Sequence, residues 1–139
     1  MLPEATRHVF VYGTLRRGQE RDINLLQPAP RWLGQASVGG VMVQLGSYPG
    51  LVLDAPGRVQ GEVYEISAEL ERQLDVIEDV WPSPGGEYIK REIAVRVEGG
   101  GSRWEDVACL VYELAPGRAS GKPVIASGDW VCYRAASAR

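Results

Sequence analysis

The chain has 139 residues, 45% of them apolar and 24% charged, and these values fit a single globular domain over residues 1–139. They exclude disordered and collagen-like chains, and a core of this size needs no disulfide or structural metal. The 15 Lys and Arg residues are outnumbered by 18 Asp and Glu residues, which gives a net charge of -3. This balance argues against nucleic acid or an anionic membrane as the main partner and favours a small molecule or a protein.

Targeting signals and metal sites can also be judged from the sequence. The first eight residues include Pro3, Glu4 and Arg7, so they lack the hydrophobic segment of a signal peptide, and we expect a cytoplasmic protein. No apolar run approaches the ~20 residues of a membrane helix. Cys109 and Cys132 lie far apart in apolar contexts, and with a single histidine they predict buried free thiols and no metal site.

Glycine and proline recur throughout the chain, which predicts short strands joined by turns. A short helix is expected over residues 22–27, ending before Pro28. The sequence Asp-Ala-Pro-Gly at 54–57 predicts a hairpin turn between two strands. The strands expected in this first half cover residues 8–12, 32–45 (interrupted at 39–40), 51–53 and 58–66.

The second half begins with the clearest helix signal. Ser67 is a good N-cap, and Leu70, Leu74 and Ile77 recur at helical spacing, which predicts a helix over residues 67–79. Glycine- and proline-rich loops follow, and the strands expected after them cover residues 88–98, 106–114 and 130–133. Together these elements predict an α+β fold in which strands dominate.

The most informative local feature is the end of the first strand, where an apolar run stops at Gly13 and opens into a basic turn reaching Gly18. Backbone N–H groups in such a turn lack partners and can hold a carboxylate or phosphate, and Gly13 lets a ligand approach closely. The Lys and Ser/Thr of a nucleotide-binding P-loop are missing after Gly18. The alternative is an ordinary strand-ending turn with solvated arginines.

A second candidate is Glu78, which shares a helix face with Leu70 and Leu74. Burial near this apolar face would raise the pKa of its carboxyl, as a group that accepts and returns a proton near neutral pH requires. The alternative is a solvated glutamate at a helix end.

Several further side chains could share a cavity with Glu78 and the turn that begins at Gly13. Tyr48, Tyr88 and Tyr112 supply phenols and Glu87 supplies a second acid, although packing and loop roles are the alternatives. Arg91 lies on the apolar side of its strand and needs an acceptor, so it either orients an acid of the site or forms a structural ion pair.

Five segments, in order across most of the chain, resemble the gamma-glutamylcyclotransferase-like (AIG2-like) superfamily, and Ser-Gly-Asp-Trp at 127–130 is similar to its small bacterial members. The resemblance implies a mixed β-barrel with flanking short helices, a cavity at one end, and neither a metal nor an organic cofactor. The five segments are residues 10–18, 48–50, 61–64, 74–78 and 88–91.

The resemblance also implies a reaction. The α-amine of a γ-glutamyl group attacks its own γ-carbonyl, which gives 5-oxoproline and releases an amine or amino acid. Glu78 matches the catalytic glutamate, the loop at 12–15 matches the segment that holds the α-carboxylate, and Glu87, Arg91 and Tyr48 are secondary candidates. The substrate-binding residues expected on this basis are Tyr12, Gly13, Thr14, Leu15 and Tyr88.

The chain departs from the family pattern at two places, because Asp79 follows Glu78 where relatives often have glycine, and residues 19–21 replace an Asn-containing continuation. Some bacterial relatives lack the helix-end glutamate and keep a Gly-Gly-Glu-Tyr like that at 85–88, so the resemblance makes Glu87 a second candidate for the acidic role, after Glu78. The alternative function is a binding module that holds a γ-glutamyl compound or carboxylate without turnover. The sequence leaves open the leaving group, which could come from a γ-glutamyl amino acid, an amine, glutathione or an isopeptide, and it leaves open the oligomeric state.

Overall fold

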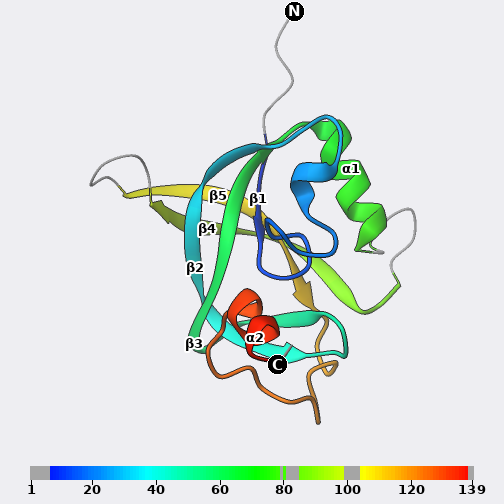
Figure 1. Ribbon diagram of the computed structural model, residues 1–139, viewed down its shortest axis with the longest axis vertical. Coiled ribbons are helices and arrows are strands. Elements are labelled where there is room, and N and C mark those ends of the chain that lie inside the picture. The colour runs from blue at the N-terminus through cyan, green and yellow to red at the C-terminus, as the bar shows by residue number, and fades with distance from the viewer. Residues whose placement is uncertain (1–6, 79, 81–84, 99–103, 138–139) are drawn as a thin grey trace, which may run out of the picture.

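Figure 1 shows the computed structural model of the chain, which describes residues 7–78, 80, 85–98 and 104–137. Its strands close into a barrel in the order β1-β3-β2-β4-β5. Neighbouring strands run antiparallel except β1 and β5, which pair in parallel. The predicted α+β mixed barrel with flanking short helices is confirmed. Its elements are β1 (Arg7–Val11), η1 (Ile23–Leu25), β2 (Arg31–Gln44), β3 (Pro49–Ile66), α1 (Ala68–Ile77), β4 (Tyr88–Glu98), β5 (Trp104–Leu114) and α2 (Trp130–Ser137).

The hairpin predicted at 54–57 is wrong, because β3 runs through this segment as one strand. Gly39 of β2 pairs with Arg58, whereas the next residue pairs with Leu53, so residues 54–57 form a bulge. The φ angles of Asp54 (56°) and Gly57 (125°) bend the strand here. Such bulges increase twist and help a long strand to curve around a barrel. The hairpin turn lies earlier, between β2 and β3.

The strand predicted at 130–133 is also wrong, since this segment begins α2. The Asp129 carboxylate accepts the Cys132 backbone N–H at 3.2 Å, a helix-capping bond that a strand does not offer. Cys132 is exposed, contrary to the prediction, whereas Cys109 is buried as expected. The predicted helix at 22–27 shortens to the single turn η1. Asp79 and the expected loop residues 82, 84 and 99–102 lie outside the described residues.

Side chains of β1 alternate between two apolar cores. Phe10 packs inside the barrel with residues from every strand, and Tyr12 continues this row just beyond β1. Val9 and Val11 face outward and pack with residues of α1, which lies on the outside of the barrel (Figure 1). The segment that follows β1 therefore starts at the junction of the two cores.

Helix α1 has the ends that its sequence predicts. The Ser67 hydroxyl accepts the Leu70 N–H at 3.0 Å, and the helix ends with Glu78 as its C-cap. Leu70 and Leu74 are 0% exposed, so the buried face continues directly to Glu78. Burial of two leucines anchors the helix by about 2 kcal/mol each. This packing fixes the position of the Glu78 backbone against the barrel.

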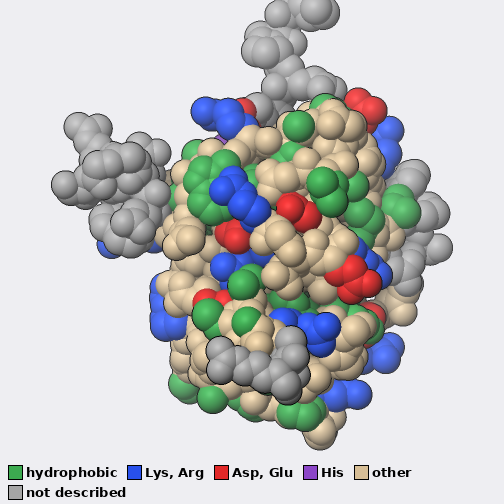
Figure 2. All heavy atoms as spheres, viewed as in Figure 1, with side chains coloured by type: hydrophobic (Ala, Val, Ile, Leu, Met, Phe, Trp, Pro, Cys, Tyr) green, Lys and Arg blue, Asp and Glu red, His purple; other side chains and the backbone are tan. Residues whose placement is uncertain are grey.

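Neither helix in residues 7–78, 80, 85–98 and 104–137 is long and apolar enough to cross a membrane. On the face shown in Figure 2, basic and acidic side chains are interspersed over the surface.

Candidate active site

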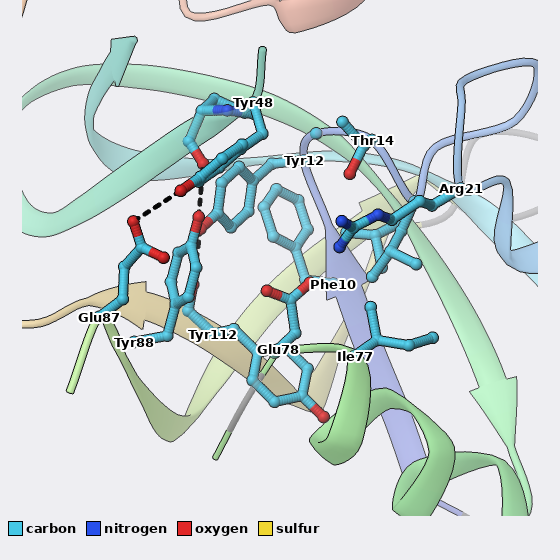
Figure 3. Close-up of a pocket in the computed structure, with 14 residues that line it drawn as sticks. Phe10, Tyr12, Thr14, Arg21, Tyr48, Ile77, Glu78, Glu87, Tyr88 and Tyr112 are labelled. Carbon is cyan, nitrogen blue, oxygen red and sulfur yellow. Dashed lines mark hydrogen bonds between the residues drawn. The ribbon is translucent and has the colours of Figure 1, made fainter. Parts of the chain in front are cut away.

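A cavity of about 190 Å³ lies where β1 and α1 both end. Its walls come from the loop after β1, the β2–β3 turn, the end of α1, the start of β4 and the end of β5 (Figure 3). The structure therefore brings together segments that are far apart in the sequence. Every predicted site residue except Arg91 lines this cavity, namely Tyr12, Gly13, Thr14, Leu15, Tyr48, Glu78, Glu87 and Tyr88.

The loop after β1 presents backbone donors to the cavity. The N–H groups of Arg16, Arg17 and Gly18 are all used within the protein, by a carbonyl or by carboxylates. In contrast, the N–H groups of Gly13 and residues 14–15 donate to no acceptor within the described part of the chain. Adjacent unpaired amides of this kind form a concave site for a carboxylate or phosphate.

A buried ionic network holds this loop on the barrel. The Arg16 Nε donates to Glu62 Oε2 at 3.1 Å, and its Nη1 donates to Asp129 Oδ1 at 3.0 Å. Glu62 Oε1 accepts the Arg17 N–H and the Tyr64 hydroxyl, each at 2.9 Å. Arg16 is 7% exposed and Glu62 is 5% exposed, so removing either partner would leave a buried charge, at a cost of about 3–5 kcal/mol. The network therefore fixes the backbone that presents the amides.

Glu78 has the electrostatics of a proton-transfer group. Burial in the cavity raises the pKa of its carboxyl from the usual 4.5 to about 7, with a smaller contribution in the same direction from nearby Glu87. The positive charge of Arg21 acts in the opposite direction. A carboxyl with a pKa near 7 is partly ionised at neutral pH, so it can both accept and return a proton.

Two tyrosines form a neutral wall beside Glu78. The Tyr12 hydroxyl donates to the carbonyl of Tyr112 at 2.6 Å, and the Tyr88 hydroxyl donates to the carbonyl of Pro49 at 3.0 Å. Burial is the main cause that raises the pKa of both phenols well above 10. These hydroxyls therefore remain protonated at physiological pH, and the wall carries no charge of its own.

The second acid of the cavity is engaged by a phenol. The Tyr48 hydroxyl donates to Glu87 Oε1 at 2.9 Å, and this hydrogen bond raises the pKa of the Tyr48 phenol (Figure 3). Glu87 faces Glu78 from the opposite side of the cavity from Arg21 (Figure 3). Glu78 thus lies between a cation and an anion, and no hydrogen bond from a described residue contributes to the pKa of its carboxyl.

Arg91 lies apart from the cavity. Its Nη1 donates to Glu113 Oε1 at 2.8 Å, and Glu113 Oε2 accepts the Leu53 N–H at 2.9 Å. Glu113 is 8% exposed, so the arginine neutralises a nearly buried carboxylate that links β5 to β3. Of the two alternatives for Arg91, the structure favours the structural ion pair.

Sequence reasoning gave no role to Arg21, which lines the cavity with its guanidinium close to Glu78 (Figure 3). The Arg21 N–H donates to the Thr14 carbonyl at 2.9 Å, which folds the loop back on itself. No local pattern predicts this contact, because it joins two irregular segments. The phenol expected of Tyr112 near the cavity is there: its ring lines the cavity, and its hydroxyl donates to Asp75 at 2.6 Å.

Comparisons with known proteins agree with this geometry. A Vibrio cholerae protein with the provisional name gamma-glutamylcyclotransferase is 42% identical over 128 residues, covering 91% of this chain and 96% of its own. The rat gamma-glutamylaminecyclotransferase is 34% identical over 123 residues, 78% of each chain. The crystal structure of a mouse AIG2-like protein superposes with a TM-score of 0.65 at 29% identity, covering 79% of this chain and 78% of the mouse chain.

These names agree with the prediction of a cyclotransferase enzyme. The family described as "Gamma-glutamyl cyclotransferase, AIG2-like" matches residues 9–132, which include the loop after β1 and Glu78. The chain therefore belongs to the gamma-glutamyl cyclotransferase, AIG2-like family.

Proposed function

We propose that the protein converts a γ-glutamyl amine or γ-glutamyl amino acid to 5-oxoproline and the released amine, with Glu78 as the general acid and base. The proposal rests on one observation: the Glu78 carboxyl, whose pKa is about 7, and the unpaired amides of residues 13–15 line the same cavity. Family membership and the names of the relatives support the class of reaction.

The amides of residues 13–15 position the substrate. They bind its α-carboxylate, which places the neighbouring α-amine and the γ-carbonyl over Glu78. Ring closure is then an intramolecular attack, for which effective molarities reach about 10⁵ M or more. Positioning by the loop therefore supplies a large part of the rate, and the rigid ionic network beneath the loop maintains it.

Glu78 moves the protons. An α-amine titrates at about 7.7 to 8.0, so at neutral pH most of it is protonated and cannot attack until a base removes a proton. The amine that has lost this proton to solvent attacks the γ-carbonyl, and ionised Glu78 takes the further proton that the attacking nitrogen loses as the new C–N bond forms. The carboxyl then gives it to the departing nitrogen as the original amide bond breaks, so water is not consumed and Glu78 returns to its ionised form.

The test compares three glutamine variants on a panel of γ-glutamyl compounds, with 5-oxoproline followed by mass spectrometry. Glu78→Gln keeps the shape and removes the base, and it should lower kcat by about 10²- to 10⁴-fold. Glu69→Gln, at an exposed position in the first turn of the same helix, is the matched control and should retain full activity. Glu87→Gln decides between the two acids of the cavity.

Full activity in Glu78→Gln with loss in Glu87→Gln would transfer the acidic role to Glu87. Absence of 5-oxoproline from every compound with the folded wild type would contradict the proposal. Tight binding of a γ-glutamyl compound without any product would instead support the binding module.

A further inference from the structure

Arg21 is an arginine of the cavity without an ionic partner. Its guanidinium forms no ion pair with any described residue, whereas Arg16 and Arg91 are both paired with nearly buried glutamates. Arg21 is exposed, yet the hydrogen bond from its N–H to Thr14 keeps its backbone at the cavity. Its positive charge also acts on Glu78. An arginine in this position offers a fork of N–H donors that suits a carboxylate.

A second groove adjoins the cavity and shares Arg21 and Ile77 with it. Its other lining residues include Leu25, which is 75% exposed, and Leu26, so one side is apolar. The groove is also lined by Glu20, which is exposed, and by Asp22, whose carboxylate is used inside the loop. It accepts the Gly18 N–H at 2.8 Å, the Asn24 N–H at 2.9 Å and the Asn24 side chain at 2.8 Å.

We infer that this groove receives the leaving group, and that its arginine and its apolar side select an α-amino acid with an apolar side chain. Arg21 binds the α-carboxylate of the departing amino acid, and the leucines contact its side chain. The inference rests on the proposed cyclotransferase function and specifies its substrate class. It favours γ-glutamyl amino acids over γ-glutamyl amines that lack a carboxylate.

Two observations assign Arg21 to the leaving group rather than to the glutamyl carboxylate. The amides of residues 13–15 already provide donors for one carboxylate inside the cavity. The side chain of Arg21 lies on the wall that the cavity shares with the groove, and Glu78 lies between Arg21 and the tyrosines on the far side (Figure 3). A nitrogen protonated by Glu78 can therefore leave with its carbon chain toward Arg21.

The experiment uses two substrates that differ by one carboxylate, γ-glutamyl-leucine and γ-glutamyl-3-methylbutylamine. The wild type should prefer the leucine compound in kcat/KM. In Arg21→Gln this preference should fall by about 10- to 100-fold, the effect of losing a charge-assisted hydrogen bond. Arg21→Lys should retain part of the preference. Arg72→Gln, which removes an exposed arginine of α1, is the matched control and should leave kcat/KM for both substrates unchanged.

The groove has its own test. Leu25→Asn should lower kcat/KM for γ-glutamyl-leucine more than for γ-glutamyl-alanine, so the preference between the two compounds should fall, and an unchanged preference would contradict the assignment of this groove.

The outcomes separate the inference from the function on which it rests. If Arg21→Gln loses activity equally on both substrates, Arg21 binds the glutamyl part and the inference is wrong. An unchanged ratio between the substrates would also overturn it. If the folded wild type forms no 5-oxoproline from either compound, the proposed function fails and the inference fails with it.

Discussion

Replacing Glu78 with glutamine should make the protein more stable at pH 8 while it removes activity. The folded protein raises the pKa of the Glu78 carboxyl from 4.5 to about 7, so the folded state binds this proton more tightly than the unfolded chain does. The stabilisation is complete below pH 4.5 and is lost as the pH rises through 7. Above pH 7 the buried, ionised carboxylate destabilises the folded state, whereas glutamine stays neutral and has no such cost.

The magnitude follows from the interval between the two pKa values. Each pH unit corresponds to about 1.4 kcal/mol, which sets an upper value of about 3 kcal/mol above pH 7. Glu78 keeps some contact with solvent through the cavity, so screening reduces the effect to about 2 kcal/mol. For a domain of this size, that difference raises the midpoint of thermal unfolding by roughly 6–8 °C.

The assay is urea unfolding of the wild type and Glu78→Gln at several pH values between 4.5 and 8.5. The difference in unfolding free energy should be near zero at pH 4.5 and should increase to a plateau above pH 7. Glu69→Gln, on the exposed face of the same helix, should show no such trend. A difference that stays constant across the pH range would refute the assignment of a desolvated carboxyl at residue 78.

Three further predictions concern the walls of the cavity. Glu87→Gln removes a negative charge near Glu78, so the acidic limb of the kcat/KM profile should move to lower pH than in the wild type. In Gly13→Ala the new Cβ would lie 2.7 Å from the Pro49 ring, so the loop must shift. Because misplacement of a bound substrate by about 1 Å costs about 100-fold, kcat/KM should fall by about that factor. Unchanged kinetics would contradict close packing at Gly13. Tyr112→Phe removes a hydrogen bond to a carboxylate of α1 and should cost about 1 kcal/mol in urea unfolding, with the ring still in place.

The sequence predicted those parts of the fold that depend on local patterns. The apolar run of β1 and the helical spacing of Leu70 and Leu74 are local, and both elements lie where they were expected. The Asp-Ala-Pro-Gly segment has turn chemistry, but the same residues suit a bulge. Only the pairing of β3 with β2 on both sides of the segment distinguishes the two, and this pairing is long-range.

The site shows the same division. Gly13 and Glu78 are predictable because each ends a regular element whose pattern is visible in the sequence. Arg21 is not predictable, because a hydrogen bond to residue 14 brings it to the cavity and no periodicity encodes that contact. The run that begins at Trp130 predicts a strand as readily as a helix, because four consecutive apolar or aromatic residues fit either period. The capping carboxylate before it determines the helix.

The carboxylate of Asp129 serves two structures at once. Its Oδ1 accepts the N–H that starts α2 and also the guanidinium of Arg16, which anchors the loop carrying the cavity amides. Fraying of the first turn of α2 would therefore release one of the two anchors of Arg16, although the helix itself does not line the cavity. The amide protons of Arg17 and Cys132 should accordingly exchange with solvent as one cooperative unit.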